Sequence, residues 1–178
     1  MADNGNTPPF EDTSAPASMR TSTFIKASPE TLYRAFTDPT ALVVWLVPGN
    51  MTGKVHSFDL RVGGGYRMSL YYPSSESTIP GKTADKEDRY TARFVELVPA
   101  TRIVEAITFD SDDSAFSGEM TMMVTLEAEN EGTTVSITFK GIPVGIRPED
   151  NEAGTQSSLE KLARYVEVGP WGTSIKEL

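Results

Sequence analysis

The chain contains no cysteine and a single histidine, His56, among its 178 residues. Without cysteine it has no disulfide, no thiolate metal ligand and no thiol nucleophile. With one histidine it has no imidazole cluster for a metal ion, and any Ser-His-Asp triad would depend on His56 alone. We therefore predict neither a metal site nor a cofactor.

Positive charge is also scarce. Sixteen Lys and Arg residues stand against twenty-five Asp and Glu residues, which gives a net charge of −9. Nucleic-acid backbones and anionic membrane surfaces both require a basic surface on the protein that binds them. The basic residues here are scattered among acids, so we expect no nucleic-acid partner.

Long apolar runs are missing as well. No stretch approaches the ~18 apolar residues that cross a bilayer. The first twenty residues, "MADNGNTPPFEDTSAPASMR", have neither the charged nor the apolar region of a secretory signal. These observations predict no membrane insertion and a cytoplasmic location.

The remaining composition is that of one globular domain. Hydrophobic residues make up 38% of the chain, and a chain of this length buries roughly 70% of its unfolded surface. Residues 1–18 are rich in Asn, Thr, Ser, Pro and Ala, which predicts a flexible tail. We place the domain at residues 19–169 and a short C-terminal tail at residues 170–178.

Two short helices are expected after a first strand, "TSTFIKA" (21–27). Ser28 and Pro29 are typical of the N-cap and first position of a helix over "PETLYRAF". Asp38 and Pro39 can begin the second short helix, "TALVVWL", which Pro48 and Gly49 end.

From Met51 onward, apolar and polar residues alternate with the period of a strand. The pattern predicts about six antiparallel strands, each with one buried and one exposed face. The faces predicted to point inward carry Tyr66, Met68 and Leu70; Met120, Met122, Val124 and Leu126; and Val135, Ile137 and Phe139.

A long amphipathic helix ends the pattern, because Thr155, Leu159, Leu162 and Val166 form one apolar stripe. The order of strand, two short helices, several strands and long helix predicts an α+β fold. In it, a curved antiparallel sheet wraps around the C-terminal helix.

Three glycines, Gly63 to Gly65, precede one of these strands in "FDLRVGGGYRMSLYY" (58–72). A phosphate-binding loop needs its glycines between a strand and a helix. A strand follows here, and no Gly-Lys-Ser/Thr is present, so the glycines are predicted to form a tight turn or bulge.

These motifs together resemble the START-like (SRPBCC, Bet v 1-like) superfamily, in its branch of activator of heat-shock-protein-90 ATPase homologues. The resemblance covers about residues 20–168. It rests on the order and spacing of "ASPETLYRAFTDPTALVVWLVP", "FDLRVGGGYRM", "FVELVPATRIVEAITF" and "SSLEKLARYVE". It departs from the family at Gly154-Thr155, where the family usually carries a glycine-tryptophan pair, and this loss would leave volume in a cavity.

The resemblance implies a helix-grip fold with a cavity between the sheet and the long helix. The family binds hydrophobic or amphipathic small molecules there, and some superfamily members catalyse cyclisation or dehydration. The name-giving branch stimulates a chaperone ATPase, so a chaperone partner is a further expectation from the resemblance.

Our main prediction is a domain that binds a hydrophobic small molecule in this cavity; ordinary core packing is the alternative interpretation of the same apolar faces. A cyclase or dehydratase in the same cavity and a chaperone-regulating interaction module remain alternatives. The predicted ligand-binding residues are Trp45, Tyr66, Met68, Leu70, Tyr90, Phe94, Phe109, Met120, Met122, Thr155, Ser158, Leu159 and Leu162.

Two residues are candidates for acid–base catalysis. Glu105 shares a strand face with Ile103, Ile107 and Phe109, and an inward carboxyl there would have a raised pKa. We expect the opposite face to point inward, because unpaired carboxylates are rarely buried. His56, just before the second strand of the sheet, is interpreted as a surface or core residue rather than a base.

Two further segments are open to interpretation. The polar stretch 73–87 is long for the family and is a candidate gate to the cavity. Trp171, beyond the last helix, could either cover an opening or take part in a homodimer contact.

Overall fold

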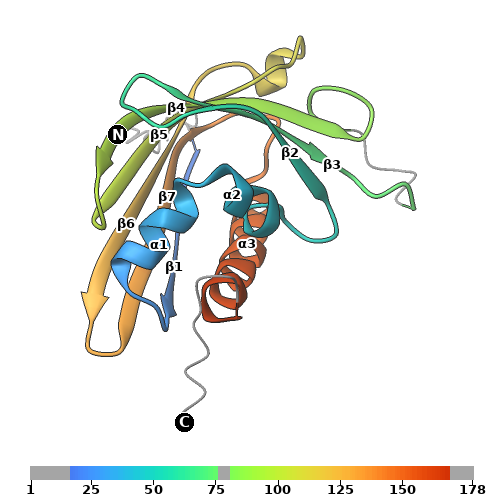
Figure 1. Ribbon diagram of the computed structural model, residues 1–178. Coiled ribbons are helices and arrows are strands. Elements are labelled where there is room, and N and C mark those ends of the chain that lie inside the picture. Colours follow the sequence, from blue (N-terminus) through green and yellow to red (C-terminus); the bar gives the residue numbers. More distant parts are fainter. Residues whose placement is uncertain (1–16, 76–80, 169–178) are drawn as a thin grey trace, which may run out of the picture.

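The computed structural model describes residues 17–75 and 81–168, and within them it has the predicted order of elements (Figure 1). Strand β1 (Ala17–Ile25) is followed by the helices α1 (Pro29–Phe36) and α2 (Pro39–Trp45). Six more strands and the long helix α3 (Pro148–Val168) complete the fold. The strands are β2 (Thr52–Asp59), β3 (Gly65–Tyr71), β4 (Glu87–Val98), β5 (Arg102–Phe109), β6 (Met120–Glu129) and β7 (Gly132–Ile142), with the 3-10 helix η1 (Ser114–Phe116) between β5 and β6.

The seven strands form one antiparallel sheet in the order β1-β7-β6-β5-β4-β3-β2. Every neighbour from β2 to β7 is also the next strand along the chain, which is a meander. Only β1 joins the sheet out of sequence, beside the last strand β7. The sheet curves over α3, and the two short helices lie beside α3 at the side where the sheet is open (Figure 1). This is the predicted α+β helix-grip architecture.

The ends of the short helices follow from local sequence. The Ser28 hydroxyl accepts a hydrogen bond from the backbone N–H of Thr31, and the Asp38 carboxylate accepts one from Thr40. Pro29 and Pro39 occupy the first turns, where a missing backbone N–H has no effect on the helix. Both predicted caps are thereby confirmed.

The glycine turn is structural, as predicted. Gly63 donates its backbone N–H to Phe94, and Phe94 donates to Gly64, so the turn between β2 and β3 pairs with β4. Gly65 has a φ of +152°, and a Cβ atom there would lie 1.9 Å from the carbonyl oxygen of Ala92. Only glycine fits that position, and no phosphate is needed to explain it.

The core lies between the concave face of the sheet and the helices, where the predicted inward residues of β3, β6 and β7 are buried or half-buried. The α3 stripe of Thr155, Leu159, Leu162 and Val166 is buried against it. In the part of the chain that the structure describes, no helix is long and apolar enough to cross a membrane.

The N-terminal boundary differs from the prediction. β1 begins at Ala17, so residues 17 and 18, assigned to the tail, pair instead with the end of β7. The rest of the predicted tail, residues 1–16, and the predicted C-terminal tail with Trp171 lie outside the described residues.

Candidate functional site

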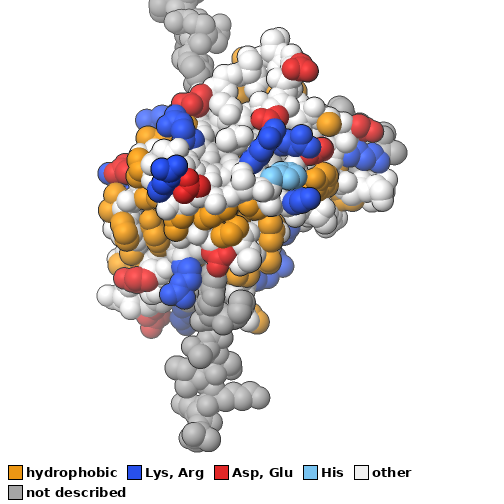
Figure 2. Space-filling model, turned by 45° about the horizontal axis from the view of Figure 1, so that its top comes forward, with side chains coloured by type: hydrophobic (Ala, Val, Ile, Leu, Met, Phe, Trp, Pro, Cys, Tyr) orange, Lys and Arg blue, Asp and Glu red, His pale blue; other side chains and the backbone are white. Residues whose placement is uncertain are grey.

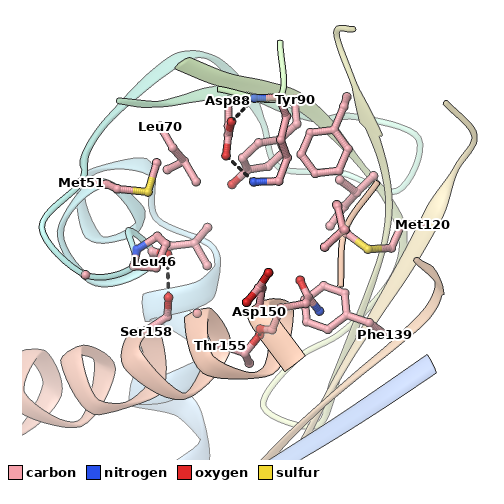
Figure 3. Close-up of a pocket in the computed structure, with 18 of the residues that line it drawn as sticks. Leu46, Met51, Leu70, Asp88, Tyr90, Met120, Phe139, Asp150, Thr155 and Ser158 are labelled. Carbon is pink, nitrogen blue, oxygen red and sulfur yellow. Dashed lines mark hydrogen bonds and ion pairs between the residues drawn. The ribbon is translucent and has the colours of Figure 1, made fainter. Parts of the chain in front are cut away.

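A cavity of about 700 Å³ lies between the concave face of the sheet and α3 (Figure 3). Its walls come from β3 to β7, from the chain after α2, and from the first half of α3. Arg147 and Asp150, which also line it, are exposed, so the cavity reaches solvent beside the N-terminus of α3. A cavity of this size can take a small organic molecule.

Most of the predicted ligand-binding residues line this cavity. They are Trp45, Tyr66, Leu70, Tyr90, Phe109, Met120, Met122, Thr155 and Ser158. Alternation along the strands and the helical stripe put these side chains on faces that turn toward each other. Apolar and aromatic side chains therefore form most of the inner wall.

Four predicted residues are not part of the wall. Met68, Phe94, Leu159 and Leu162 are each 0% exposed and belong to the close-packed core. They share faces with lining residues, but they lie where sheet and helix are in direct contact. Periodicity identifies the inward face of an element and not the depth at which the cavity ends.

A charged cluster that the sequence analysis missed lies at the outer end of the cavity. The Lys82 ammonium lies 2.6 Å from the carboxylate of Asp88, which is 3% exposed. Asp88 also accepts hydrogen bonds from the backbone N–H of Lys82, at 2.6 Å, and from the Tyr72 hydroxyl, at 2.8 Å. Burial acts to lower the pKa of Lys82, but attraction to Asp88 outweighs it and the pKa is raised.

The signal for Asp88 was available in the sequence. Asp88, Tyr90, Ala92 and Phe94 alternate along β4, which begins at Glu87. Extending the alternation would have placed Asp88 on the inner face beside Tyr90. Lys82 precedes β4 without any periodic pattern, so only the tertiary structure identifies it.

A second ion pair faces the first across the cavity. The Arg147 guanidinium binds Asp150 at 2.8 Å, within the first turn of α3 and its approach. Hydrogen bonding to Arg147 lowers the pKa of Asp150, and Lys82 adds a smaller attraction. Asp150 and Thr155 rise from α3 toward the wall that carries Asp88 and Tyr90 (Figure 3). The outer end thus carries two cations and two carboxylates.

The prediction that the Glu105 face of β5 points outward was wrong, because the Glu105 side chain points inward and is 1% exposed. Glu105 is paired with Phe94 on β4 and with Met122 on β6, and both of those side chains are buried. Burial raises its pKa to about 7, although the hydrogen bond from the Tyr66 hydroxyl, at 3.0 Å, acts in the opposite direction. Glu105 does not line the cavity itself; Tyr66 does.

His56 lies outside the cavity, as expected, although it belongs to β2 rather than preceding it. It is exposed on the outer surface, close to Lys and Arg side chains (Figure 2). Its Nε2 atom is 2.8 Å from the Ser69 hydroxyl, which donates to Glu87 at 2.7 Å. In these hydrogen bonds Ser69 lies between His56 and Glu87, whereas a nucleophilic triad has the histidine between the serine and the carboxylate. Ser69 is also fully buried, so the three residues do not form a nucleophilic triad.

Helix α3 also holds the end of α2 beside the cavity. The Ser158 hydroxyl donates to the carbonyl of Leu46 at 2.8 Å, and the Ser157 hydroxyl accepts from the backbone N–H of Gly49. The Lys161 ammonium donates to the carbonyls of Val47, at 2.5 Å, and Gly49. These bonds fix residues 46–49, which form one rim of the cavity.

Gly154 and Thr155, the departure from the family pattern, both line the cavity. The Thr155 hydroxyl donates to the carbonyl of Asn151 one turn earlier, so it is already satisfied within α3. Both positions therefore border the cavity, which is where the missing indole was expected to leave volume. Among the described residues no group of three or more acidic or histidine side chains could hold a metal ion.

The chain matches a family model described as "Activator of Hsp90 ATPase homolog 1-like protein" over residues 26–167. Among solved structures, the crystal structure of protein CV1439 from Chromobacterium violaceum is similar, with a TM-score of 0.74 and 37% identity. That similarity covers 85% of this chain and 99% of the other. A search of curated proteins finds no significant match.

Two other solved structures share the fold at lower identity. The solution structure of the AHSA1-like protein from Aeromonas hydrophila has a TM-score of 0.63 and 22% identity, over 85% of this chain and 92% of the other. DynU16, a protein in the dynemicin biosynthetic locus, has a TM-score of 0.59 and 20% identity. The match covers 85% of this chain and 47% of DynU16.

Proposed function

Because this chain belongs to the family of Activator of Hsp90 ATPase homolog 1-like proteins, we propose that it binds a hydrophobic or amphipathic small molecule between the sheet and α3. The cavity of about 700 Å³ carries this proposal. Met120, Met122 and Phe109 supply apolar wall, and burial of apolar ligand surface favours binding by ~25 cal/mol per Å² before entropic losses.

The charged residues at the outer end of the cavity determine which polar groups a ligand can carry there. Lys82 and Arg147 are each paired with a carboxylate, so the rim carries no excess of either sign. A ligand therefore gains no net attraction from a formal charge. It needs an apolar body and, at the rim, a group that can exchange hydrogen bonds with Lys82, Asp88 or Asn151.

The first experiment is native mass spectrometry of freshly purified protein, followed by organic extraction and identification of what is released. A bound amphipathic molecule of a size that fits the cavity is the expected result. A clean apo mass, together with no thermal shift across a panel of amphipathic compounds, would contradict the proposal.

A cyclase- or dehydratase-type enzyme in the same cavity is a second candidate. Glu105 favours it, because this carboxyl lies behind the wall but accepts a hydrogen bond from Tyr66, which lines the cavity. A carboxyl with a pKa near 7 can both give and take a proton at neutral pH. The Glu105→Gln variant would then lose turnover of an identified ligand while still binding it. Equal turnover in this variant and the wild type would contradict the enzymatic candidate.

A chaperone-regulating function, which the description of the family suggests, would act through a different surface. Three exposed apolar residues, Leu60, Val62 and Val95, are available where the turn before β3 meets β4. Stimulation of an Hsp90 ATPase that is lost in Val62→Asp but kept in a variant with a filled cavity would support this third candidate. Absence of any stimulation by the wild-type protein would contradict it.

A further inference from the structure

At its inner end the cavity wall has a polar pair that the outer ion pairs do not reach. Tyr66 lines the cavity, and its hydroxyl donates to the carboxyl of Glu105, which lies behind the wall. Tyr66 is 3% exposed and Glu105 is 1% exposed, so neither group is solvated by bulk water. A buried polar pair of this kind has to satisfy its hydrogen bonds within the protein or with a ligand.

The register of the sheet places this pair far from the rim. Glu105 lies opposite Phe94 on β4, whereas Asp88, at the rim, is six residues earlier on the same strand. Six residues of strand correspond to about 20 Å. Tyr66 is paired with Ala92, four residues from Asp88 on β4, which corresponds to about 13 Å. A ligand in the cavity therefore meets the charged groups at the rim and Tyr66 farther in.

In the described part of the chain, no positively charged side chain stabilises the ionised form of Glu105. The titratable groups that face it are two tyrosines, Tyr66 on β3 and Tyr90 on β4, whose rings lie 6.2 Å apart. The neighbours of Glu105 on the adjacent strands, Phe94 on β4 and Met122 on β6, are apolar and buried. Among the described residues, no cationic side chain contributes to the pKa of Glu105.

We propose that Tyr66 is the binding site for a carbonyl oxygen on an uncharged ligand, and that Glu105 is the positioning residue that directs the Tyr66 hydroxyl. This inference rests on the proposed ligand-binding function and names the class of ligand. An anionic ligand group is excluded at this end, because it would be buried without a counter-charge.

The protonation state of Glu105 sets the direction of its hydrogen bond with Tyr66, and this direction controls the binding of a ligand carbonyl. When Glu105 is ionised it can only accept a hydrogen bond, so the Tyr66 O–H donates to Glu105 and is not available to a ligand in the cavity. When Glu105 is protonated, its own O–H can donate to Tyr66. The phenol O–H of Tyr66 is then released from Glu105 and can donate to a ligand carbonyl, for which the neighbouring Tyr90 hydroxyl is the competing acceptor.

The ligand carbonyl thus binds the form of the protein in which Glu105 is neutral. Because the pKa of Glu105 is about 7, this form is abundant at pH 6 and makes up about a tenth of the protein at pH 8. Apparent affinity scales with the competent fraction, so a carbonyl ligand binds about tenfold more weakly at pH 8 than at pH 6. A ligand without an acceptor has no such dependence.

The test uses two fluorescent aromatic probes of similar shape. One is 6-propionyl-2-(dimethylamino)naphthalene, a neutral ketone, and the other is 2-(dimethylamino)naphthalene, which lacks the carbonyl. Their dissociation constants are measured from pH 6 to pH 8.5 on wild type, Glu105→Gln and Tyr66→Phe, after circular dichroism has shown that each variant is folded. The cavity-filling Thr155→Trp variant verifies that both probes bind inside the cavity.

The wild type should lose about tenfold in affinity for the ketone between pH 6 and pH 8, with no loss for the second probe. In Glu105→Gln the side-chain amide can donate permanently to Tyr66, so this variant should bind the ketone with the same affinity at every pH. Tyr66→Phe should bind both probes alike, without pH dependence.

Two outcomes separate the inference from the function on which it rests. If both probes bind inside the cavity and the ketone affinity of the wild type is unchanged with pH, the inference is overturned and the binding function stands. If neither probe binds at any pH and the protein purifies without a ligand, the proposed function fails and the inference fails with it.

Discussion

The ammonium of Lys82 and the carboxylate of Asp88 form an ion pair of 2.6 Å at the rim of the cavity, with the Asp88 side chain 4% exposed. Lys82 comes from the segment before β4, and Asp88 is the second residue of that strand. The pair attaches the segment before β4 to the wall of the cavity.

Lys82→Met should lower the free energy of unfolding by about 2 kcal/mol, because it leaves the buried Asp88 carboxylate without its cation. This is less than the 3–5 kcal/mol typical of fully buried pairs, since the Lys82 side chain is 25% exposed. Urea denaturation measures the change. The double variant Lys82→Met/Asp88→Asn should recover part of the loss, and additive losses in the double-mutant cycle would show that the two residues are not coupled.

Thr155→Trp should abolish or strongly weaken uptake of small molecules, since an indole at this lining position occupies cavity volume. Gln156→Trp is the matched control, because Gln156 is the next residue of the same helix and is exposed. Dissociation constants for the neutral ketone probe compare the three proteins. Equal affinity in Thr155→Trp and wild type would place binding outside this cavity.

Glu105 should make the protein less stable as the pH rises. Its pKa is about 7 in the folded state and 4.5 ordinarily, so between these values the folded state holds a proton that the unfolded state has lost. The stabilisation is complete below pH 4.5 and is lost as the pH rises through 7.

Between pH 5 and pH 8 the loss amounts to about 2–3 kcal/mol. Other carboxyls, such as Glu87 and Asp150, have lowered pKa values and act in the opposite direction. The measurement is therefore the difference in unfolding free energy between wild type and Glu105→Gln at each pH. A difference that stays constant with pH would mean that Glu105 titrates normally.

Two adjacent serines on α3 should differ in their effect on stability. Ser158→Ala removes the buried hydrogen bond to the Leu46 carbonyl and should cost about 1–2 kcal/mol. Ser157→Ala removes the bond from the Gly49 N–H, which water can replace because this site is exposed, and should cost less than about 0.5 kcal/mol. Thermal denaturation of both variants tests this, and equal losses would contradict the role assigned to Ser158.

The order and type of the elements could be predicted because they depend on local properties. The caps at Ser28 and Asp38 act within one turn, and alternation in β3, β6 and β7 is a property of each strand alone. The inward face of β5 could not be predicted. Ile103, Glu105 and Ile107 alternate with Val104, Ala106 and Thr108, and neither set is clearly more apolar. Pairing with Phe94 and Met122 decided it.

By itself the sequence determined a helix-grip fold without cysteine chemistry, a structural role for Gly63 to Gly65, and the faces that meet around α3. Only the tertiary structure decided where the core ends and the cavity begins, and that Glu105 and Asp88 are buried while His56 is exposed. Periodicity follows from the geometry of one helix or strand. Depth, ion pairing and the pKa of a carboxyl depend on side chains far apart in the chain, and folding alone brings these together.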